Sequence, residues 1–444
     1  MDYKFTNLRV QVSLALSAAS ALIYEVVVTN LLFFYFIRSS YSIATVLSVF
    51  LFGLGLGSLL IYFLLNKIKN KILLFSILQI FIALYAFFVL TNLTEIIPKV
   101  STFGTFATSF AVLLIPTIFL GAIFPLAGSI FKKKDKDIIG LIYSYDLFGA
   151  IIGTLVAGFI LIPLYGANVA IIFGAVLNIF SALLMFSKKL KIIPVLVLAV
   201  FLITFPKSEG ANEYQFYSNS PYGVVKVQNH TLYIEEREQC SMYYDEAASE
   251  RLMGKYALKP LGNDLDILII GLGCGLTLEE CLEYDVEVDV VEINYQVVLA
   301  NKVMTNVLTD PRINLIVDDG LNYLRHNEKK YDSILIDVEN PAIAHSSNLY
   351  TVEAFQIISN SLKEDGTFAL WNYNAGWNRY LDILYYSLKE AFPYVYSYSD
   401  SNVFLATKQK LNQKEYVPRG PYEVNTIDRN LLTQVYLDRL NKKV

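Results

Sequence analysis

The residues best suited to chemistry lie in the second half of the chain and begin with a glycine-rich loop. Residues 266–278 read DILIIGLGCGLTL, an apolar run followed by Gly271, Gly273 and Gly275. The apolar run predicts a buried parallel strand. The glycines allow unusual backbone angles and let a ligand approach the main chain closely. The GxGxxG fingerprint of NAD-type sites is not matched, since Leu276 stands where its last glycine would be.

Three carboxylates follow the loop, each at the end of an expected strand. They are Glu292 in VDVVEIN, Asp319 after INLIVD, and Asp337 after SILI. Open α/β sheets bind ligands outside the carboxyl ends of their strands, and an acid after the second strand accepts hydrogen bonds from ribose hydroxyls. Capping of the following helix could account for an acid at any one of these strand ends, but it accounts poorly for acids at all three. The glycine loop and Glu292 together predict a nucleoside-binding site.

The elements that must position these residues alternate regularly. Strand and helix patterns follow one another from about residue 246, which predicts a doubly wound parallel sheet. Short strands at 223–228 and 231–235 predict a small β unit over residues 207–245. We expect the α/β domain to occupy residues 246–410 and a polar C-terminal tail to follow over residues 411–444.

The first 206 residues have the composition of a membrane domain. The chain is 55% hydrophobic and only 17% charged, whereas soluble proteins carry about 25% charged residues. Runs of about 20 apolar residues cross a bilayer as helices. Residues 1–206 therefore predict an α-helical bundle of about seven spans. The expected spans are 10–36, 41–65, 72–91, 104–130, 138–163, 167–187 and 190–206. The first run is too long for a cleavable signal peptide.

Basic residues are unequally divided between the two ends of these spans. One side carries Lys4, Arg9, Lys67, Lys69, Lys71, Lys132, Lys133, Lys134, Lys136, Lys188, Lys189 and Lys191. The other side carries Arg38, Lys99 and Lys207. The positive-inside rule places the N-terminus in the cytoplasm of a multi-pass cell-membrane protein. Seven spans would put the α/β domain outside, whereas a last segment lying in the interface would leave it in the cytoplasm.

Small and acidic residues in the spans suggest how the bundle is built. Small residues at 53, 55, 57 and 58, and the pair Gly149 and Gly153, let helix backbones approach closely. Glu25 and Asp146 are the polar candidates of the membrane domain, because a carboxylate in hydrocarbon usually faces a partner or a wet cavity. They indicate either a proton, cation or polyamine site or a hydrogen-bonded packing contact.

Composition also excludes several classes of protein. A net charge of −4 argues against a nucleic-acid partner. The three cysteines, Cys240, Cys274 and Cys281, do not form a disulfide framework or a metal-binding pattern with the three histidines. We therefore expect no metal site.

The soluble motifs resemble those of the spermidine synthases, the polyamine aminopropyltransferases. DPRINLIVDDGLNYL, GLGCG, VVEIN, YDSILIDVENP and LYTVEAF follow the blocks of that family, and Ser220-Pro221-Tyr222 resembles the start of its N-terminal β unit. The apolar half resembles membrane-embedded spermidine synthase-like proteins in SAASALIYEVVVTNLL and GLIYSYDLFGAIIGTLVAGFILIPLYG. The resemblance implies a Rossmann-like domain of the class I methyltransferase and spermidine synthase type.

The resemblance also implies residue roles. Decarboxylated S-adenosylmethionine would be the co-substrate, with no tightly bound cofactor, and 5′-methylthioadenosine would be the product. Glu292 would hold the ribose, Asp319 and Gly320 would contact the adenine, and Asp337 would accept the proton of an attacking amine such as putrescine. The amine would be the small-molecule partner, and the family implies a homodimer. Supply of the cytosolic donor favours a cytoplasmic domain, whereas the charge bias favours an outside one.

Several positions depart from the family pattern where it contacts the amine. Cys274 replaces the acid of the glycine loop, Asn340 replaces the second acid of D-x-x-D-P, and Gly223 replaces a glutamine. Candidate substrate contacts are therefore Tyr222, Tyr243, Tyr244, Cys274, Glu339, Asn340 and Tyr350. Tyr350, Trp371, Tyr373 and Trp377 could form a cation cage or could simply pack in the core. Cys274 is interpreted as a small loop residue rather than a nucleophile.

Three functions remain open. The first is aminopropyl transfer to an amine, and the second is methyl transfer from S-adenosylmethionine through the same nucleoside contacts. The third is a non-enzymatic membrane sensor or transporter that binds a nucleoside or polyamine, with Glu25 and Asp146 in the bundle. Donor preference separates the first two, and the fold resemblance alone does not decide among the three.

Overall fold

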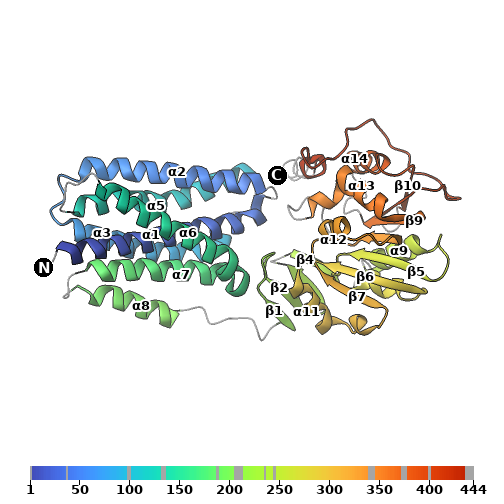
Figure 1. Cartoon of the computed structure of the whole chain (residues 1–444), viewed down its shortest axis with the longest axis horizontal. Coiled ribbons are helices and arrows are strands. Elements are labelled where there is room, and N and C mark those ends of the chain that lie inside the picture. The colour runs from blue at the N-terminus through green and yellow to red at the C-terminus, as the bar shows by residue number, and fades with distance from the viewer. Residues whose placement is uncertain are drawn as a thin grey trace. The chain divides into compact units, whose positions relative to one another are not determined.

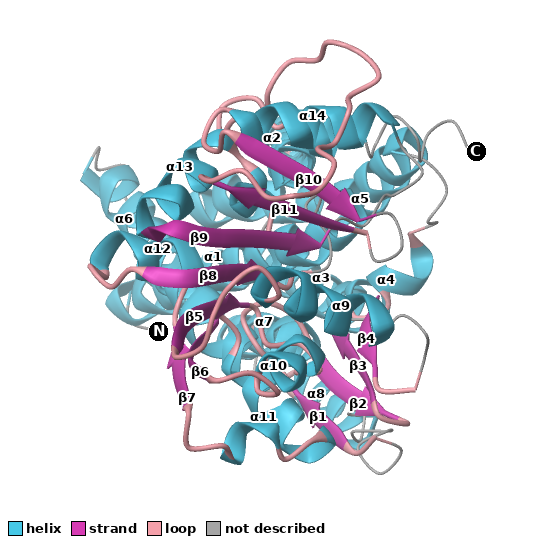
Figure 2. Cartoon of the chain, turned by 90° about the vertical axis from the view of Figure 1, so that its right-hand side faces the viewer, coloured by secondary structure: helices cyan, strands magenta, loops and turns pink. Residues whose placement is uncertain are grey.

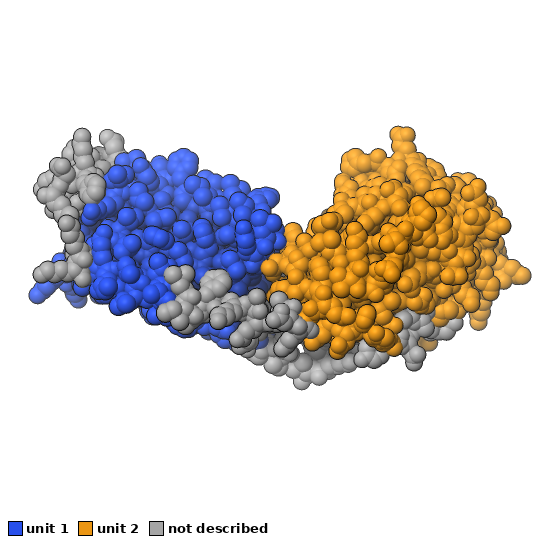
Figure 3. Space-filling model, turned by 90° about the horizontal axis from the view of Figure 1, so that it is seen from below, with its two compact units in different colours: residues 1–207, 444 blue, residues 208–443 orange. Residues whose placement is uncertain are grey.

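The protein is described here by a computed structural model, which divides into two compact units, residues 1–207 with 444 and residues 208–443 (Figure 3). The structure describes residues 3–36, 39–97, 102–131, 137–186, 190–204, 214–234, 237–243, 247–338, 346–371, 378–398 and 402–435.

All the regular elements of unit 1 are helices over its described residues (Figure 1). Its helices are α1 (Tyr3–Phe36), α2 (Ser39–Leu64), α3 (Lys71–Tyr85) continued by η1 (Ala86–Leu90), α4 (Leu93–Ile96), α5 (Thr102–Ile130), α6 (Asp137–Val156) continued by η2 (Ala157–Leu161), α7 (Ile162–Met185) and α8 (Ile192–Thr204). Leucine, isoleucine, valine and phenylalanine fill these helices, so the bundle presents apolar side chains both to its own core and outward.

Five segments of unit 1 are long and apolar enough to cross a membrane. They are Asn7–Leu32, Tyr41–Leu64, Lys71–Leu90, Gly104–Ile130 and Ile139–Met185. The last has 47 residues and contains two of the expected spans, because Gly166 breaks the helix with φ 82° and ψ 170°. Only glycine adopts these angles readily, which explains the residue at this turn. The expected span at 190–206 contains α8, whose 13 residues are fewer than the about 20 of an ordinary membrane-spanning helix.

The expected close packing of small residues is present at most of these positions. A Cβ atom on Gly53 or Gly57 of α2 would collide with α5, and a Cβ atom on Gly149 or Gly153 of α6 would collide with the backbone of α1. Gly55 differs, since its side faces open space. Glycine at the four contact positions therefore lets neighbouring backbones touch.

Glu25 and Asp146, the two acids expected in the bundle, lie at different heights along the helix axes. Gly149 meets Ala15 and Gly153 meets Ala19, so α6 and α1 run parallel. This register places Asp146 near the level of Val12, about 20 Å along the axis from Glu25. Both acids are partly exposed. The helices therefore do not combine Glu25 and Asp146 into one site.

Unit 2 begins with a small antiparallel sheet of order β1-β2-β3-β4. Its strands are β1 (Phe216–Ser218), β2 (Val225–Gln228), β3 (Thr231–Ile234) and β4 (Arg237–Ser241). The turn between β2 and β3 places Asn229 and His230 at positive φ, as a two-residue hairpin requires.

The main sheet has seven strands in the order β10-β11-β9-β8-β5-β6-β7 (Figure 2). Strands β5 (Leu265–Ile270), β6 (Val286–Glu292), β7 (Ile313–Val317), β8 (Tyr331–Ile336) and β9 (Leu362–Trp371) are parallel, whereas β10 (Tyr394–Tyr398) and β11 (Val403–Thr407) are antiparallel to their neighbours. The order reverses at β5, so the sheet is doubly wound as predicted.

Helices cover both faces of this sheet. They are α9 (Ala247–Leu258), α10 (Leu276–Cys281), α11 (Tyr295–Met304), η3 (Val307–Thr309), α12 (Gly320–His326), η4 (Ser347–Tyr350), α13 (Val352–Ser361) and α14 (Asn378–Lys389). One apolar core lies under α9, α10 and α11, and a second lies under α12, α13 and α14. The four-stranded sheet packs into the first core through Val225, Val227 and Leu232.

The chain after β11 differs from the expected polar tail. Leu431, Leu432 and Val435 are buried in the second core, and Asn425 is 0% exposed. Residues 411–435 therefore belong to the α/β domain rather than to a separate tail. Sequence pattern misses this packing because the few apolar residues are separated by polar ones that are satisfied only in the folded domain.

Candidate functional site

The glycine loop leaves β5 at the point where the order of the sheet reverses. Gly271, Gly273 and Gly275 all have positive φ, at 96°, 49° and 84°. A Cβ atom on Gly271 would lie 2.3 Å from the carbonyl oxygen of Asp337, and one on Gly275 would lie 2.9 Å from the Asn301 side chain. At Gly271 and Gly275, both the positive φ angles and the close neighbouring atoms therefore require glycine. The contact at Gly271 holds the loop against the end of β8.

Glu292 ends β6 and fastens this loop to its neighbour. Its carboxylate accepts the backbone N–H of Leu272 at 2.9 Å and the backbone N–H of Asn294 at 2.8 Å. Burial raises the pKa of Glu292, and these backbone hydrogen bonds oppose that rise. Each oxygen retains further acceptor capacity, because a carboxylate can accept about four hydrogen bonds.

Asp319 and Gly320 follow β7 at the next strand end. Asp319 is exposed and caps α12 by accepting the Asn322 N–H at 2.8 Å. A Cβ atom on Gly320 would lie 2.4 Å from the Ile270 side chain, so glycine here lets α12 start directly against β5.

Asp337 follows β8 on the other side of β5. Its backbone N–H donates to the Ile270 carbonyl at 2.9 Å. Burial raises the pKa of Asp337 to about 6, the Thr277 hydroxyl opposes the rise by hydrogen bonding, and the negative charge of Glu292 adds to it. The Thr277 hydroxyl also reaches the Glu250 carbonyl at 3.1 Å.

Tyr222 lies within the electrostatic influence of two of these acids. Burial raises the pKa of its hydroxyl, and the charges of Asp319 and Glu292 raise it further. The Ser220–Gly223 turn that carries Tyr222 is closed by reciprocal backbone hydrogen bonds of 3.1 and 3.2 Å, and Gly223 has φ 114°. The Ser220 hydroxyl accepts the Asn294 side chain at 3.1 Å, which docks the turn onto the end of β6. Glycine at 223 is thus explained by the turn.

The structure brings the predicted nucleoside residues together. The ends of β8, β5, β6 and β7 are adjacent in the sheet, so the glycine loop, Glu292, Asp319 and Asp337 share one edge. Sequence reasoning missed Thr277 and Asn294, whose hydrogen bonds join residues from different elements. Their only sequence signal was their position just after the loop and just after Glu292.

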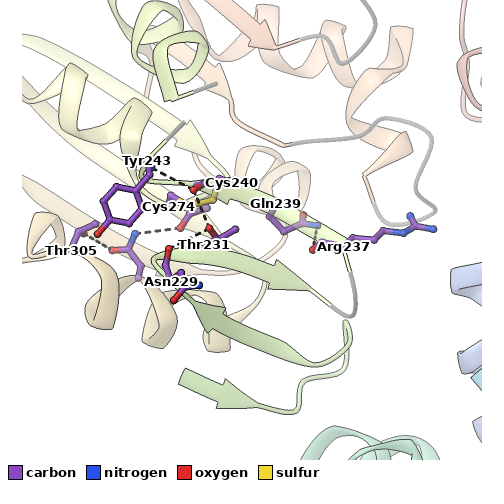
Figure 4. The surroundings of a disulfide bond; sticks show 11 residues. Asn229, Thr231, Arg237, Gln239, Cys240, Tyr243, Cys274 and Thr305 are labelled. Atoms are coloured by element: carbon purple, nitrogen blue, oxygen red, sulfur yellow. Dashed lines mark hydrogen bonds between the residues drawn. A yellow bond between two sulfur atoms is a disulfide. The ribbon is translucent and has the colours of Figure 1, made fainter. Parts of the chain in front are cut away.

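Two predicted substrate contacts need correction. Cys274 is 1% exposed and forms a disulfide with Cys240 of β4 (Figure 4), a pairing that the sequence pattern did not predict, so this side chain does not face a substrate. Tyr350 is 0% exposed, and its hydroxyl donates to the Val338 carbonyl at 2.7 Å. Tyr350 is therefore a core residue rather than a wall of a cation cage.

The remaining predicted contacts have different outcomes. Tyr243 is 71% exposed, with its ring 5.4 Å from that of His230 in an edge contact. Tyr244, Glu339, Asn340, Tyr373 and Trp377 lie outside the described residues. Within the described ranges, no group of three or more histidine, cysteine or acidic side chains could hold a metal ion.

Comparisons with known proteins agree with this arrangement. Residues 246–400 match the family described as "Spermine/spermidine synthase domain". A "Polyamine aminopropyltransferase 2" of Aquifex aeolicus is 24% identical over 278 residues, which cover 56% of each chain. A "Polyamine aminopropyltransferase 2" of Bacillus cereus is 32% identical over 157 residues, or 33% of this chain and 42% of the relative.

Among solved structures, the spermidine synthase of Thermotoga maritima superimposes with a TM-score of 0.38 at 20% identity, covering 52% of this chain and 89% of that one. The chain spans little more than half the length of the first curated relatives that it matches, at 56% and 58%. The family match over residues 246–400 includes the strands and loops that carry the glycine loop and the three acids. Residues 246–400 thus match the spermine/spermidine synthase domain family.

Proposed function

We propose that unit 2 transfers an aminopropyl group from decarboxylated S-adenosylmethionine to an amine and releases 5′-methylthioadenosine. The observation that carries the proposal is the shared edge of β8, β5, β6 and β7, where Asp337 lies next to the glycine loop and Glu292 accepts a backbone N–H of the same loop. The domain's family and the names of its relatives support this reaction over others of the same fold.

The donor's nucleoside is assigned to the loop and the next two strand ends. The glycine loop admits the donor close to the main chain, Glu292 accepts the ribose hydroxyls, and Asp319 with Gly320 borders the adenine. The position of Glu292 supports this role, since its carboxylate already fixes the loop at Leu272. Tyr222, whose pKa the charges of Glu292 and Asp319 raise, is assigned to cover the bound nucleoside.

Asp337 is assigned to the chemistry. A protonated amine has no free lone pair, so its ammonium group first gives a proton to the Asp337 carboxylate. The nitrogen lone pair then forms a bond to the propyl carbon next to the sulfonium, and the carbon–sulfur bond breaks with its electrons moving to sulfur. Sulfur becomes neutral and methylthioadenosine leaves. A pKa of about 6 leaves Asp337 ionised at neutral pH while keeping it basic enough to take the proton.

The acceptor is proposed to differ from that of the typical family member. The loop position that the family uses for an amine contact is occupied here by a disulfide. Asn340 stands where the family has a second acid, and few carboxylates remain near Asp337 in the sequence. Glu339, next to Asn340, is one of them. An amine with fewer positive charges than a long polyamine fits this loss of carboxylates.

The test is product release by the full-length protein in detergent. We expect methylthioadenosine to appear when decarboxylated S-adenosylmethionine is mixed with a panel of mono-, di- and polyamines, measured by liquid chromatography. S-adenosylmethionine with the same panel is the control. Release of S-adenosylhomocysteine from the control, without methylthioadenosine from the test, would replace the proposal with a methyltransferase, which could use the same nucleoside contacts.

We further propose that the bundle crosses the membrane seven times and leaves unit 2 on the outer side. Phe201 near the end of α8 is 1% exposed and stacks on Phe87 of η1 with ring centroids 4.1 Å apart. Lys71 begins α3, and Phe87 lies near the opposite end of the continuous helix formed by α3 and η1. Because Phe201 stacks on Phe87, the end of α8 lies near the face opposite the lysine-rich loops. The positive-inside rule places those loops in the cytoplasm.

The disulfide supports the same side, because disulfides persist in oxidising compartments and are rare in the cytosol. Cys240 and Cys274 are expected to be bonded in intact cells. A membrane-impermeant phosphine followed by a polyethylene-glycol maleimide should then add mass to both cysteines, and omission of the phosphine should add none. If Cys240 and Cys274 were labelled without the phosphine, but only after the cells were lysed, the domain would lie in the cytoplasm. A Cys240→Ser/Cys274→Ser variant controls for Cys281, which is buried.

A further inference from the structure

The segment after β11 is fastened to the α/β domain by buried polar contacts, and residues 411–435 are called the strap below. The Tyr416 hydroxyl donates to one oxygen of Asp382 at 2.7 Å, and the Arg419 backbone N–H donates to the other at 3.0 Å. Asp382 lies on α14 and is fully buried. The first half of the strap is thus held on α14 through a single carboxylate.

Asn425 fastens the second half of the strap with every polar group that it has. Its side-chain N–H donates to the Tyr350 carbonyl at 2.8 Å, and its side-chain oxygen accepts the Leu432 N–H at 3.1 Å. Its backbone N–H donates to the Ser387 hydroxyl at 2.8 Å, and its backbone carbonyl accepts the Val352 N–H at 2.9 Å. A buried amide with all its partners fixes their positions closely, since losing any one leaves a buried polar group unpaired.

Tyr350 continues these contacts toward the site. Asn425 holds its main chain, and its own hydroxyl donates to the Val338 carbonyl at 2.7 Å. Val338 directly follows Asp337. The negative charge of Asp337 also adds to the effect of burial in raising the pKa of Tyr350.

We propose that Asn425 is a positioning residue for Asp337, and that it acts through Tyr350 and the Val338 carbonyl. The contacts fix the backbone just after β8, on which the direction of the Asp337 carboxylate depends. Among the contacts of the described residues, Asn425 touches neither the loop nor the other acids at the strand ends, so it reaches the site only through the β8 end. The catalytic part of this inference rests on the function proposed above.

The first test needs no substrate. Hydrogen–deuterium exchange of the full-length protein in detergent follows the Asp337 amide, which is bonded to Ile270, in peptides that end at Val338. Asn425→Ala and Tyr350→Phe should both speed exchange there. Asn430→Ala is the matched control: it removes the side chain that accepts the Thr433 N–H at 3.1 Å within the same strap but has no contact with Tyr350 among those described. Unchanged exchange in both variants would overturn the proposal, whatever reaction the domain performs.

The second test uses methylthioadenosine release. Asn425→Ala and Tyr350→Phe should lower kcat on the order of tenfold to a hundredfold, as expected for a misdirected catalytic group, with donor affinity within about twofold. Both should shift the acidic limb of the kcat–pH profile. The double variant should be no worse than the poorer single variant, because both act through one contact. Additive losses, or an equal loss in Asn430→Ala, would show that the strap only stabilises the fold. A wild-type protein without transferase activity would overturn the proposed function and leave the exchange result standing.

Discussion

Replacing Asp337 with asparagine is expected to lower kcat for aminopropyl transfer about 10²- to 10⁴-fold, the usual contribution of a positioned base. Asparagine keeps the size and can accept the Thr277 hydroxyl, but it cannot take a proton from an ammonium group. Methylthioadenosine should bind nearly as well as to the parent protein, because the nucleoside contacts lie at the loop, β6 and β7. The measurement is product release together with calorimetric binding of methylthioadenosine.

The pH dependence of the parent enzyme should report the same group. Activity should fall as the pH drops through about 6, where Asp337 becomes protonated. The Asp337→Asn variant should lose this limb along with most of its rate. If the variant kept full activity, or if it lost nucleoside binding, Asp337 would not be the base assigned here.

Stability should change in the opposite direction from activity. The pKa of Asp337 is raised from an ordinary 3.8 to about 6, so ionising it costs folding free energy that is absent at low pH and fully present above pH 6. That cost is on the order of 2–3 kcal/mol at 1.36 kcal/mol per pKa unit. Asp337→Asn should therefore unfold at a higher temperature than the parent at pH 8, and the difference should shrink toward pH 4.

Replacing Glu292 with glutamine is expected to weaken binding of the donor and of methylthioadenosine on the order of 100-fold, since hydrogen bonds to a charged acceptor contribute about 1.5–3 kcal/mol each. Both oxygens of Glu292 accept backbone N–H groups, from Leu272 and Asn294. Glutamine would present its own NH₂ group to one of these donors. The glycine loop would shift as well as the ribose contact, and calorimetry would measure both losses together.

Asp289 provides the matched control for Glu292. It lies on the same strand and is also buried, but its partners are Tyr331, Lys329 and Asn314. Asp289→Asn should therefore cost stability without changing nucleoside affinity beyond about twofold. Equal losses of affinity in the two variants would mean that Glu292 acts only by stabilising the domain.

Much of the fold follows from local patterns in the chain. The apolar strand runs and the turn residues between them predict a doubly wound sheet, and that sheet necessarily collects the residues at its strand ends. The site residues Glu292, Asp319 and Asp337 were accessible to sequence reasoning for this reason. Close helix contacts at Gly53, Gly149 and their neighbours follow equally from a spacing that places small residues on one helix face.

The features that could not be predicted join residues distant in the sequence. Cys240 and Cys274 lie on different elements, and only the docking of the small sheet on the loop brings them into bonding range. Asn425 sits in a polar stretch whose composition suggests an exposed tail, yet its partners lie on η4, α13 and α14. The burial of Tyr350 depends on the same packing. Side-chain pattern carries local periodicity but not these long-range partners.

The most direct test of the proposed function is calorimetric titration of the full-length, detergent-purified protein with decarboxylated S-adenosylmethionine, S-adenosylmethionine and 5′-methylthioadenosine. We expect the decarboxylated donor and methylthioadenosine to bind at least tenfold more tightly than S-adenosylmethionine, a difference of about 1.4 kcal/mol. The Glu292→Gln variant should lose both. Tighter binding of S-adenosylmethionine would contradict aminopropyl transfer and favour methyl transfer, and no binding of any of the three would contradict a nucleoside site at this edge of the sheet.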